Sequence, residues 1–326
     1  MSDFKVLVTD FAWDTLDIEA RVLEPIGAEL IVSETGDEAE LLRLAPFAHA
    51  ILTNWKRVSP AVLDAAPLCR TVARYGVGVD NIAVDHATAL GILVSNVPDY
   101  CVDEVAEHAM ALLLACARSL PTFDRDIRAG KWDLAAGRPL FRVRGKTLVV
   151  VGAGNIGRVM IERARAFGLQ VIAVQRQLEG EIDGVVYTRD LHAALGRADF
   201  VSLHVPLNEG TKGLVDEHFL RAMRPGAFLI NTARGAVVNE RVLAHALREG
   251  WIRGAALDVL SSEPPPADHP LLGLPNCLIT PHAAFNSVEA VEDLQARAAG
   301  HVRDVLTGKI PPHVVNPAVL DSPHRR

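Results

Sequence analysis

The sequence is poor in cysteine and in aromatic residues, and it lacks a long run of apolar residues. Its 326 residues include 4 cysteines, and Cys69, Cys101, Cys116 and Cys277 have neither a CxxC spacing nor a spacing typical of metal ligands. We therefore expect four reduced thiols in a cytosolic protein. The longest apolar run, Ala109 to Ala117, is about half the length that a membrane-spanning helix needs.

An excess of basic charge is also missing. The formal net charge is −7, and no cluster of lysine and arginine reverses it locally, which argues against a nucleic-acid partner. Histidine, cysteine and aspartate form no cluster with metal-ligand spacing, so no metal site is predicted. The first eight residues, Met1 to Val8, indicate a strand and not a signal peptide. The basic residues His324 to Arg326 form too short a tail to predict a role.

What the sequence does contain is a regular alternation of apolar strand-like runs and helical stretches. Hydrophobic residues make up 49% of the chain, and the length predicts two domains. The alternation predicts an α/β fold with mainly parallel sheets. In the first series, strands are predicted at Lys5–Thr9, Leu30–Val32, Ala50–Thr53, Thr71–Arg74 and Leu93–Ser95, with helices such as Glu38–Leu44 and Pro60–Ala66 between them. A long helix is predicted from about Val102 to Ser119.

A second series begins at Gly145. Its strands are predicted at Thr147–Val151, Gln170–Val174, Val185–Tyr187, Phe200–His204, Ala227–Asn231, Gly254–Asp258 and Cys277–Thr280. A last helix, about Ser287–Leu306, is expected to return to the first domain, with the fold ending near Asn316. We therefore predict a discontinuous substrate domain (1–99 and 288–326) and a dinucleotide-binding domain (100–287).

A glycine-rich turn directly follows the first strand of the second series. Gly152, Gly154 and Gly157 form a GxGxxG motif that opens the amphipathic stretch Asn155 to Phe167. Glycines at these positions permit a tight turn, close approach of the backbone to a pyrophosphate and close helix–strand packing. The helix N-terminus favours the anion. This context predicts a dinucleotide site.

The residue that commonly binds the ribose 2′-hydroxyl should lie about 20 residues further on, where the chain has Gln175 and Arg176. A neutral amide removes the repulsion that a carboxylate would exert on a 2′-phosphate, and Arg176 could pair with that phosphate. NADP(H) is therefore favoured over NAD(H). In the alternative, Arg176 is solvated and Gln175 binds the ribose of NAD.

Three residues in short, distinctive contexts suit chemistry on a 2-oxo or 2-hydroxy acid. Arg234 offers a planar fork of donors that matches a carboxylate and the adjacent carbonyl oxygen. His282 can donate a proton to that oxygen or accept one from it. Glu263, as a nearby anion, would stabilise the imidazolium form and select the ring nitrogen that faces the substrate. We predict these three as the catalytic residues.

At this point the sequence closely resembles the D-isomer-specific 2-hydroxyacid dehydrogenases, over essentially residues 3–317. Within that family, Asn96–Pro98, Trp251–Val259 and Thr307–Pro311 are most similar to the C-terminal-binding-protein branch and its bacterial relatives. The resemblance implies two Rossmann-like lobes, a flavodoxin-like substrate domain and an NAD(P)-binding Rossmann domain, with the active site in the cleft between them. It also implies a homodimer built largely on the cofactor domains.

The resemblance carries further roles onto this chain. Arg234 would bind the substrate carboxylate, helped by the backbone amides of Val77 and Gly78; Asn54, Trp55, Tyr100 and Phe285 are expected to wall the pocket. Together with the glycine motif, it predicts cofactor contacts from Cys101, Gly152, Gly154, Asn155, Ile156, Gly157, Gln175, Arg176, His204, Val205, Pro206, Thr232, Ala233, Arg234, Asp258, His282 and Ala284. Cys101 departs from the family, in which a small hydroxyl residue is frequent. His108 is expected to be structural or at the dimer contact.

The leading prediction is a cytosolic NAD(P)-dependent D-2-hydroxyacid dehydrogenase that reduces a small 2-oxo acid, with glyoxylate and hydroxypyruvate as plausible substrates. Two alternatives stay open. One is a dinucleotide-sensing scaffold, as in the C-terminal-binding proteins, which retain the catalytic residues. The other is a dehydrogenase of another small anion, such as formate or phosphite, which Arg234 and His282 could also serve.

Overall fold

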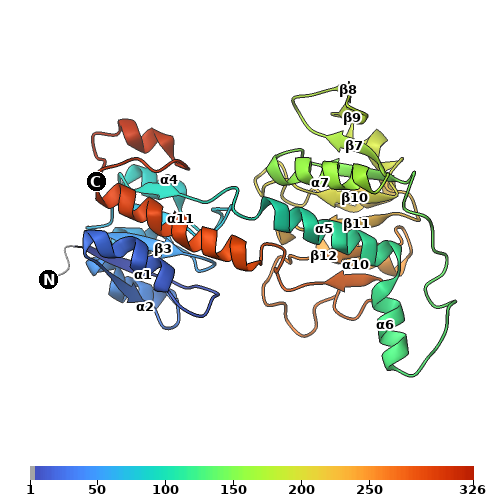
Figure 1. Ribbon diagram of the computed structural model, residues 1–326, viewed down its shortest axis with the longest axis horizontal. Helices are drawn as coiled ribbons and strands as arrows, with labels where there is room; N and C mark the ends of the chain where they lie inside the picture. Colours follow the sequence, from blue (N-terminus) through green and yellow to red (C-terminus); the bar gives the residue numbers. More distant parts are fainter. Residues whose placement is uncertain (1–3) are drawn as a thin grey trace. The chain divides into compact units, whose positions relative to one another are not determined.

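The computed structural model describes residues 4–326 and divides the chain into two compact units. The first contains residues 1–101 and 287–326, and the second contains residues 102–286. Met1 to Asp3 lie outside the described residues. They are the first residues of the predicted substrate domain and of the segment Met1 to Val8, for which a strand was predicted. Each unit is a parallel or mainly parallel sheet covered by helices on both faces (Figure 1). Among the described residues, no helix is both long enough and apolar enough to cross a bilayer.

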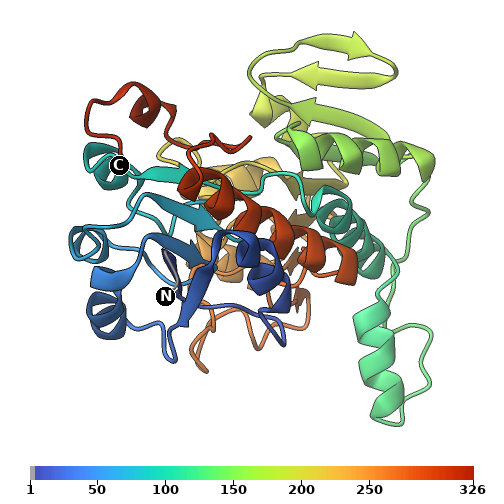
Figure 2. The same ribbon diagram turned by 60° about the vertical axis from the view of Figure 1, so that its left-hand side comes forward.

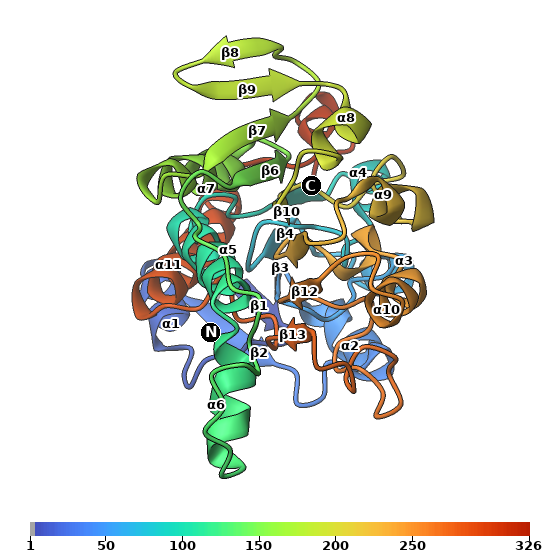
Figure 3. The same cartoon turned by 90° about the vertical axis from the view of Figure 1, so that its right-hand side faces the viewer.

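The first unit has a five-stranded parallel sheet in the order β2-β1-β3-β4-β5, the flavodoxin-like order. The strands are β1 (Phe4–Val8), β2 (Ala28–Val32), β3 (Ala50–Thr53), β4 (Thr71–Arg74) and β5 (Leu93–Ser95). Helices α1 (Asp17–Leu23) and α11 (Val288–Leu306) cover one face, and α2 (Glu38–Leu44), α3 (Pro60–Asp64) and α4 (Val84–Ala89) cover the other (Figure 3). Because α11 follows the second unit in sequence, this unit is discontinuous.

The second unit has an eight-stranded sheet in the order β13-β12-β11-β10-β6-β7-β9-β8. Apart from β8, the strands are parallel: β6 (Thr147–Val151), β7 (Gln170–Val174), β9 (Val185–Thr188), β10 (Phe200–Leu203), β11 (Phe228–Asn231), β12 (Gly254–Leu257) and β13 (Cys277–Ile279). Counted from β6, the six central strands follow the Rossmann order 3-2-1-4-5-6. The predicted fold class is therefore confirmed for both units.

Helices cover this second sheet on two faces (Figure 3). One face packs against α5 (Val102–Ala117) and α7 (Asn155–Ala166), and the other against α8 (Leu191–Leu195), α9 (Glu217–Ala222) and α10 (Glu240–Arg248). The central strands are apolar throughout, as in Leu148 to Val151 of β6, all of which are buried. A strand buried on both faces has no polar side to display, which explains the unbroken apolar runs.

The structure differs from the sequence prediction at the end of α5 and before β9. The helix expected to reach Ser119 ends at Ala117, because Ser119 adopts a positive φ of 51°. A separate helix, α6 (Leu120–Arg128), then extends away from the rest of the unit (Figure 2). The second difference is β8 (Gly180–Ile182), which pairs antiparallel with β9 through a turn at Asp183 and Gly184. Asp-Gly is a strong hairpin signal, and it explains why the chain turns back at this point.

The prediction that the fold ends near Asn316 was wrong. A 3₁₀ helix spans Pro317–Asp321, and its Val319 is fully buried. The basic tail is also tied down, because the backbone N–H of Arg326 donates to the carbonyl of Gly91 at 3.1 Å, and its guanidinium donates to the carbonyl of Ala66 at 3.0 Å. A short charged end carries no periodic pattern, so the sequence offered no sign of this docking.

Candidate active site in the second unit

The carboxyl ends of the parallel strands meet at one edge of the eight-stranded sheet, the edge at which ligands bind in open α/β sheets. Most of the residues predicted to act on cofactor or substrate follow these strand ends directly. They are Gly152 after β6, Gln175 after β7, His204 after β10, Thr232 to Arg234 after β11, Asp258 after β12 and His282 after β13. The topology thus gathers residues separated by up to 130 positions.

The loop after β6 has the close contacts that require glycine. Gly152 has a φ of 97°, and a Cβ there would lie 2.6 Å from the carbonyl oxygen of His204. A Cβ on Gly157 would lie 2.1 Å from the carbonyl oxygen of Gly152. At Gly154, by contrast, a Cβ would meet nothing within 4 Å. Helix α7 begins at the next residue, Asn155. The loop therefore offers open space in front of a helix N-terminus, where an anion is favoured.

At the end of β7 the structure has an amide and a guanidinium, with no carboxylate. Gln175 is half-buried, and its backbone N–H donates to the carbonyl of Thr188 at 3.0 Å. Arg176 is exposed. Nothing at these two positions would repel a phosphate.

His204 lies at the end of β10, and its Nε2 atom is 2.9 Å from the hydroxyl of Ser202. Burial lowers the pKa of this imidazole to about 4, so His204 is neutral at physiological pH. Val205 and Pro206 follow it, half-buried and exposed respectively. Their predicted cofactor contacts stay predictions.

The segment after β11 is folded by Asn231. Its side-chain amide donates to the carbonyl of Arg234 at 2.9 Å, and its side-chain oxygen accepts from the N–H of Ala233 at 3.0 Å. The guanidinium of Arg234 donates to the carbonyl of Ala233 at 2.8 Å. The hydroxyl of Thr232 is buried, and it has no hydrogen-bond partner among the described residues. An unsatisfied buried hydroxyl is costly, so a ligand that bonds to it would gain affinity.

His282 and Glu263 form a hydrogen-bonded pair. Nδ1 of His282 lies 2.7 Å from Oε2 of Glu263, and the side chains are 26% and 36% exposed. Oε1 of Glu263 accepts from the backbone N–H of Leu260 at 2.9 Å. Burial alone would raise the pKa of Glu263, but the hydrogen bond and electrostatic contact with His282 lower it below its usual value. Because Nδ1 is hydrogen-bonded to Glu263, Nε2 is the ring nitrogen with which the partly exposed imidazole can bind a substrate.

The carboxylate of Asp258 accepts hydrogen bonds from residues on both sides of His282. Its Oδ1 accepts from the hydroxyl of Thr280 at 2.5 Å and from the N–H of Ala283 at 3.0 Å, and its Oδ2 accepts from the N–H of Ala284 at 2.9 Å. Burial acts to raise the pKa of Asp258, but hydrogen bonds from His108, Thr280 and these amides outweigh it and lower the pKa to about 2. Asp258 is thus an anion that supports the His282 turn, in which His282 itself has a φ of 55°.

His108 completes this network from helix α5. Its Nε2 atom lies 3.0 Å from the hydroxyl of Thr280 and 3.4 Å from Oδ1 of Asp258. The sequence predicted a structural residue or a dimer contact at this position, and the contacts within the chain fit the structural role. Neither Thr280 nor the linkage itself was predicted, because nothing in the spacing of residues 108, 258 and 280 indicates contact.

The predicted residues of the first unit lie at the carboxyl ends of its own strands. Asn54 follows β3, and its backbone N–H donates to Asp10 at 3.0 Å. Its side-chain Nδ2 atom is buried and has no partner in residues 4–326. Val77 follows β4, and its carbonyl accepts from Asn96 at 2.6 Å. The substrate-binding roles of Asn54, Val77 and Gly78 stay predictions. So do the pocket-wall roles of Trp55, Tyr100 and Phe285 and the cofactor role of Cys101, which is 2% exposed.

The second unit has the features that a nicotinamide dinucleotide requires. The glycine loop has open space at Gly154, the first turn of α7 presents backbone N–H groups, and Thr232 presents an unpaired hydroxyl. The chemistry of these donors fits a pyrophosphate and an amide. In the described part of the chain, no group of three or more histidine, cysteine or acidic residues could hold a metal ion.

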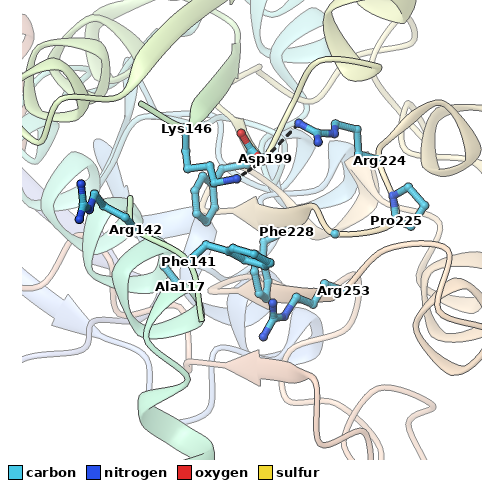
Figure 4. Close-up of a pocket in the computed structure, with 11 residues that line it drawn as sticks. Ala117, Phe141, Arg142, Lys146, Asp199, Arg224, Pro225, Phe228 and Arg253 are labelled. Atoms are coloured by element: carbon cyan, nitrogen blue, oxygen red, sulfur yellow. Dashed lines mark hydrogen bonds and ion pairs between the residues drawn. The ribbon is translucent and has the colours of Figure 1, made fainter. Parts of the chain in front are cut away.

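A separate pocket lies at the opposite edge of the same sheet, where the strands begin. It has a volume of about 300 Å³, and it is lined by Phe141, Lys146, Asp199, Arg224, Phe228 and Arg253 among others (Figure 4). Asp199 pairs with Lys146 and with Arg224, each at 3.3 Å. A neighbouring pocket is lined by residues of α6 and by Arg253, Asn276 and Cys277. None of the three predicted catalytic residues lines either pocket.

Comparisons with known proteins show the family to which this chain is similar. Residues 110–284 match the model of the D-isomer-specific 2-hydroxyacid dehydrogenase, NAD-binding domain. A glyoxylate reductase of Korarchaeum cryptofilum is 43% identical over 81% of this chain and 81% of its own length. A solved structure of a Thermus thermophilus protein has a TM-score of 0.87 and 35% identity, and the match covers 95% of this chain and 99% of that one.

The solved structure of a Sinorhizobium meliloti NADPH-dependent glyoxylate/hydroxypyruvate reductase, in complex with NADP and malonate, also matches. Its TM-score is 0.85 and its identity is 30%, and the match covers 96% of this chain and 97% of that one.

Proposed function

Because the chain belongs to the D-isomer-specific 2-hydroxyacid dehydrogenase family, we propose that it reduces glyoxylate and hydroxypyruvate. It is an oxidoreductase that transfers a hydride between a nicotinamide cofactor and a small 2-hydroxy or 2-oxo acid. The observation that carries the proposed reduction is the hydrogen-bonded pair of His282 and Glu263. His282 lies at the same sheet edge as Arg234 and the glycine loop. The names of the K. cryptofilum and S. meliloti proteins support the choice of substrates.

The chain's own residues then have distinct tasks. A bound nicotinamide dinucleotide supplies or accepts the hydride, and the protein contributes orientation and electrostatics. In reduction, the guanidinium of Arg234 holds the substrate carboxylate, and Nε2 of protonated His282 donates its proton to the carbonyl oxygen as that oxygen gains charge. Glu263 stabilises the imidazolium and fixes its orientation through Nδ1. In oxidation, neutral His282 takes the proton back.

We further propose that the cofactor is NADPH in preference to NADH. Gln175 and Arg176 support this preference. Neither side chain is a carboxylate that would repel a 2′-phosphate, and the exposed guanidinium of Arg176 is free to pair with that phosphate. The S. meliloti relative is described as NADPH-dependent. In this proposal the second unit is the dinucleotide-binding domain and the first is the substrate domain. The four cysteines are free thiols, which fits a cytoplasmic location.

We propose that the partner of the second unit is another copy of the same chain. The segment from α6 to β6 carries large apolar side chains in solvent: Leu120, Ile127, Trp132, Leu134 and Phe141 are 55%, 47%, 92%, 70% and 55% exposed. A cluster of this kind is costly in a monomer and typical of an interaction surface. The two pockets at the amino-terminal sheet edge, one of which is shown in Figure 4, adjoin this segment. They are concave and partly apolar, so they could receive such side chains from a second copy.

The test is a panel of 2-oxo acids assayed with NADPH and with NADH. Glyoxylate and hydroxypyruvate should give the highest kcat/KM, and NADPH should exceed NADH. If pyruvate or another 2-oxo acid is reduced at least tenfold more efficiently, the substrate proposal is wrong. If no 2-oxo acid is reduced at all, the catalytic proposal is wrong, and the scaffold or the oxidation of another anion must be considered again.

A further inference from the structure

A second buried acid lies behind the loop that carries Glu263. Glu240 is the first residue of α10, and its side chain is only 9% exposed. Its Oε1 accepts from the backbone N–H of Ser261 at 2.6 Å, and its Oε2 accepts from the hydroxyl of Ser261 at 2.5 Å. The same Oε2 lies 3.1 Å from Nε2 of His269, whose side chain is 7% exposed. Both oxygens are therefore engaged by residues of the 261–269 loop.

The contacts of Glu240 reach the catalytic pair through two adjacent residues, Ser261 and Leu260. Ser261 follows Leu260, whose backbone N–H donates to Oε1 of Glu263 at 2.9 Å. Glu263 then binds His282 through its other oxygen. Residues 258–276 contain no helix or strand, so no backbone ladder holds this loop. Hydrogen bonds to a buried carboxylate are charge-assisted and hence strong. At Ser261 the two hydrogen bonds to Glu240 therefore hold the loop in place of strand pairing.

The same loop is pressed against the segment that carries Arg234. A Cβ on Gly235 would lie 1.9 Å from the carbonyl carbon of Leu260 and 2.3 Å from the backbone nitrogen of Ser261. The two backbones therefore touch next to Arg234. Glu240 follows Gly235 by five residues, so it belongs to the Arg234 side of this contact and binds the Glu263 side.

We propose that Glu240 is a positioning residue that, with His269, sets the Leu260–Glu263 segment against the Arg234–Gly235 segment. Its carboxylate keeps Glu263 at hydrogen-bond distance from His282, and so acts on proton transfer without touching the substrate. The inference rests on the proposed function, in which Glu263 tunes His282. Catalytic groups must be held within about 0.5 Å of the productive geometry, which an unsupported loop does not ensure.

The first experiment compares Glu240→Gln with Glu217→Gln. Glu217 is a matched control, because it is also the first residue of a helix and follows a capping side chain. Unlike Glu240, it is exposed, and it pairs with Arg221 on its own helix at 2.8 Å. In Glu240→Gln one oxygen becomes an amide donor and cannot accept from Ser261 or His269. We expect kcat for reduction to fall roughly 10-fold, less than the roughly 100-fold that a misplacement of about 1 Å can cost. The alkaline limb of the pH profile should also move to lower pH. Glu217→Gln should leave both unchanged.

A double-mutant cycle separates positioning from general stability. In a Glu263→Gln background, Glu240→Gln should change kcat by less than about 2-fold, because its effect passes through Glu263. Fully additive losses, or an equal loss of cofactor affinity, would overturn the proposal. Ser261→Ala, a milder change at an exposed residue, should move the pH limb in the same direction by less, and it keeps the proposal testable if Glu240→Gln does not fold.

Hydrogen–deuterium exchange gives a readout that needs no turnover. The amides of Leu260 and Ser261 should exchange faster in Glu240→Gln than in the wild type or in Glu217→Gln. Unchanged exchange at these amides would overturn the positioning role even if activity fell. A wild type that reduces no 2-oxo acid would instead defeat the proposed function, while the exchange result would still report on the contact itself.

Discussion

Nδ1 of His282 lies 2.7 Å from Oε2 of Glu263, and this contact assigns different roles to the two ring nitrogens. Glu263 is ionised, because the contact with His282 outweighs burial and lowers its pKa below the usual value. An anion at Nδ1 keeps a proton there, so Nε2 is the nitrogen that exchanges a proton with substrate. A histidine without a carboxylate at Nδ1 could present either ring nitrogen to the substrate.

Replacing His282 by alanine should lower turnover in reduction by roughly 100-fold or more, the usual scale for a lost acid–base group. Cofactor affinity should change little, because the glycine loop and α7 are far along the sheet edge from β13. Steady-state kinetics on the best 2-oxo acid and fluorescence titration with NADPH measure the two effects. Near-wild-type turnover would disprove the assignment of His282.

Replacing Glu263 by glutamine should move the alkaline limb of the reductive pH profile to lower pH. Reduction needs protonated His282, and the Glu263 anion extends that form to higher pH. Because the pKa of Glu263 is itself lowered, the anion persists throughout the neutral range, so the effect should appear on the alkaline side. Full pH profiles of kcat for both proteins test this, and an unmoved limb would show that Glu263 does not tune His282.

The carboxylate of Asp258 should make the free energy of unfolding depend on pH in the acid range. Its pKa falls from a usual 3.8 to about 2 in the folded protein, so the folded state is stabilised above pH 3.8, and this contribution is lost as the pH falls from about 4 to 2. The shift corresponds to about 2 kcal/mol. Denaturant unfolding of Asp258→Asn against the wild type should show a difference at pH 7 that narrows in this window. A constant difference would mean that the carboxylate charge is not what matters.

Asp258→Asn should also lower kcat while it leaves the fold intact. The two carboxylate oxygens of Asp258 accept from the N–H groups of Ala283 and Ala284, whereas in asparagine one of these oxygens is replaced by an NH₂ group that cannot accept. The turn that carries His282 would then be less well held. Asp216→Asn is a suitable control, since Asp216 caps α9 away from this network. Equal effects of the two substitutions on kcat would contradict a specific role for Asp258.

Arg176→Ala should weaken the use of NADPH by about 1–3 kcal/mol, the scale of one charge-assisted contact. The use of NADH should barely change, because its ribose has no phosphate. Gln175→Asp should weaken NADPH use further and improve NADH use. Kinetics with both cofactors decide between the possibilities: equal losses with the two would mean that Arg176 does not contact the phosphate, and a wild type that strongly prefers NADH would contradict the proposal outright.

Trp132→Ser should shift the protein from dimer to monomer at micromolar concentration, because it removes the most exposed large apolar side chain of the α6 segment. Phe167→Ser is the matched control, since Phe167 is a 49% exposed aromatic residue at the end of α7. Sedimentation velocity measures the distribution. A wild type that sediments as a monomer would contradict the dimer proposal before any variant is made.

Local patterns in the sequence were sufficient for the elements and for the chemical types at the site. The buried strands are read from unbroken apolar runs, and the predicted limits of Ala50–Thr53, Thr147–Val151 and Gln170–Val174 are those observed. The GxGxxG motif is recognisable from its spacing, and at Gly152 and Gly157 the close contacts leave no room for a Cβ. Arg234, Glu263 and His282 stand in short motifs, so their types could be assigned without coordinates.

Only the tertiary structure decided which polar groups support them. The contacts of Asp258 with Thr280 and His108, and of Glu240 with Ser261 and His269, join residues 21 to 150 positions apart. These partners lie at strand ends, in loops or on helix surfaces, where neither the period of 2 nor the period of 3.6 constrains the spacing. Such contacts depend on how the strands order themselves in the sheet and on how the loops between them pack, and a linear pattern does not contain that information.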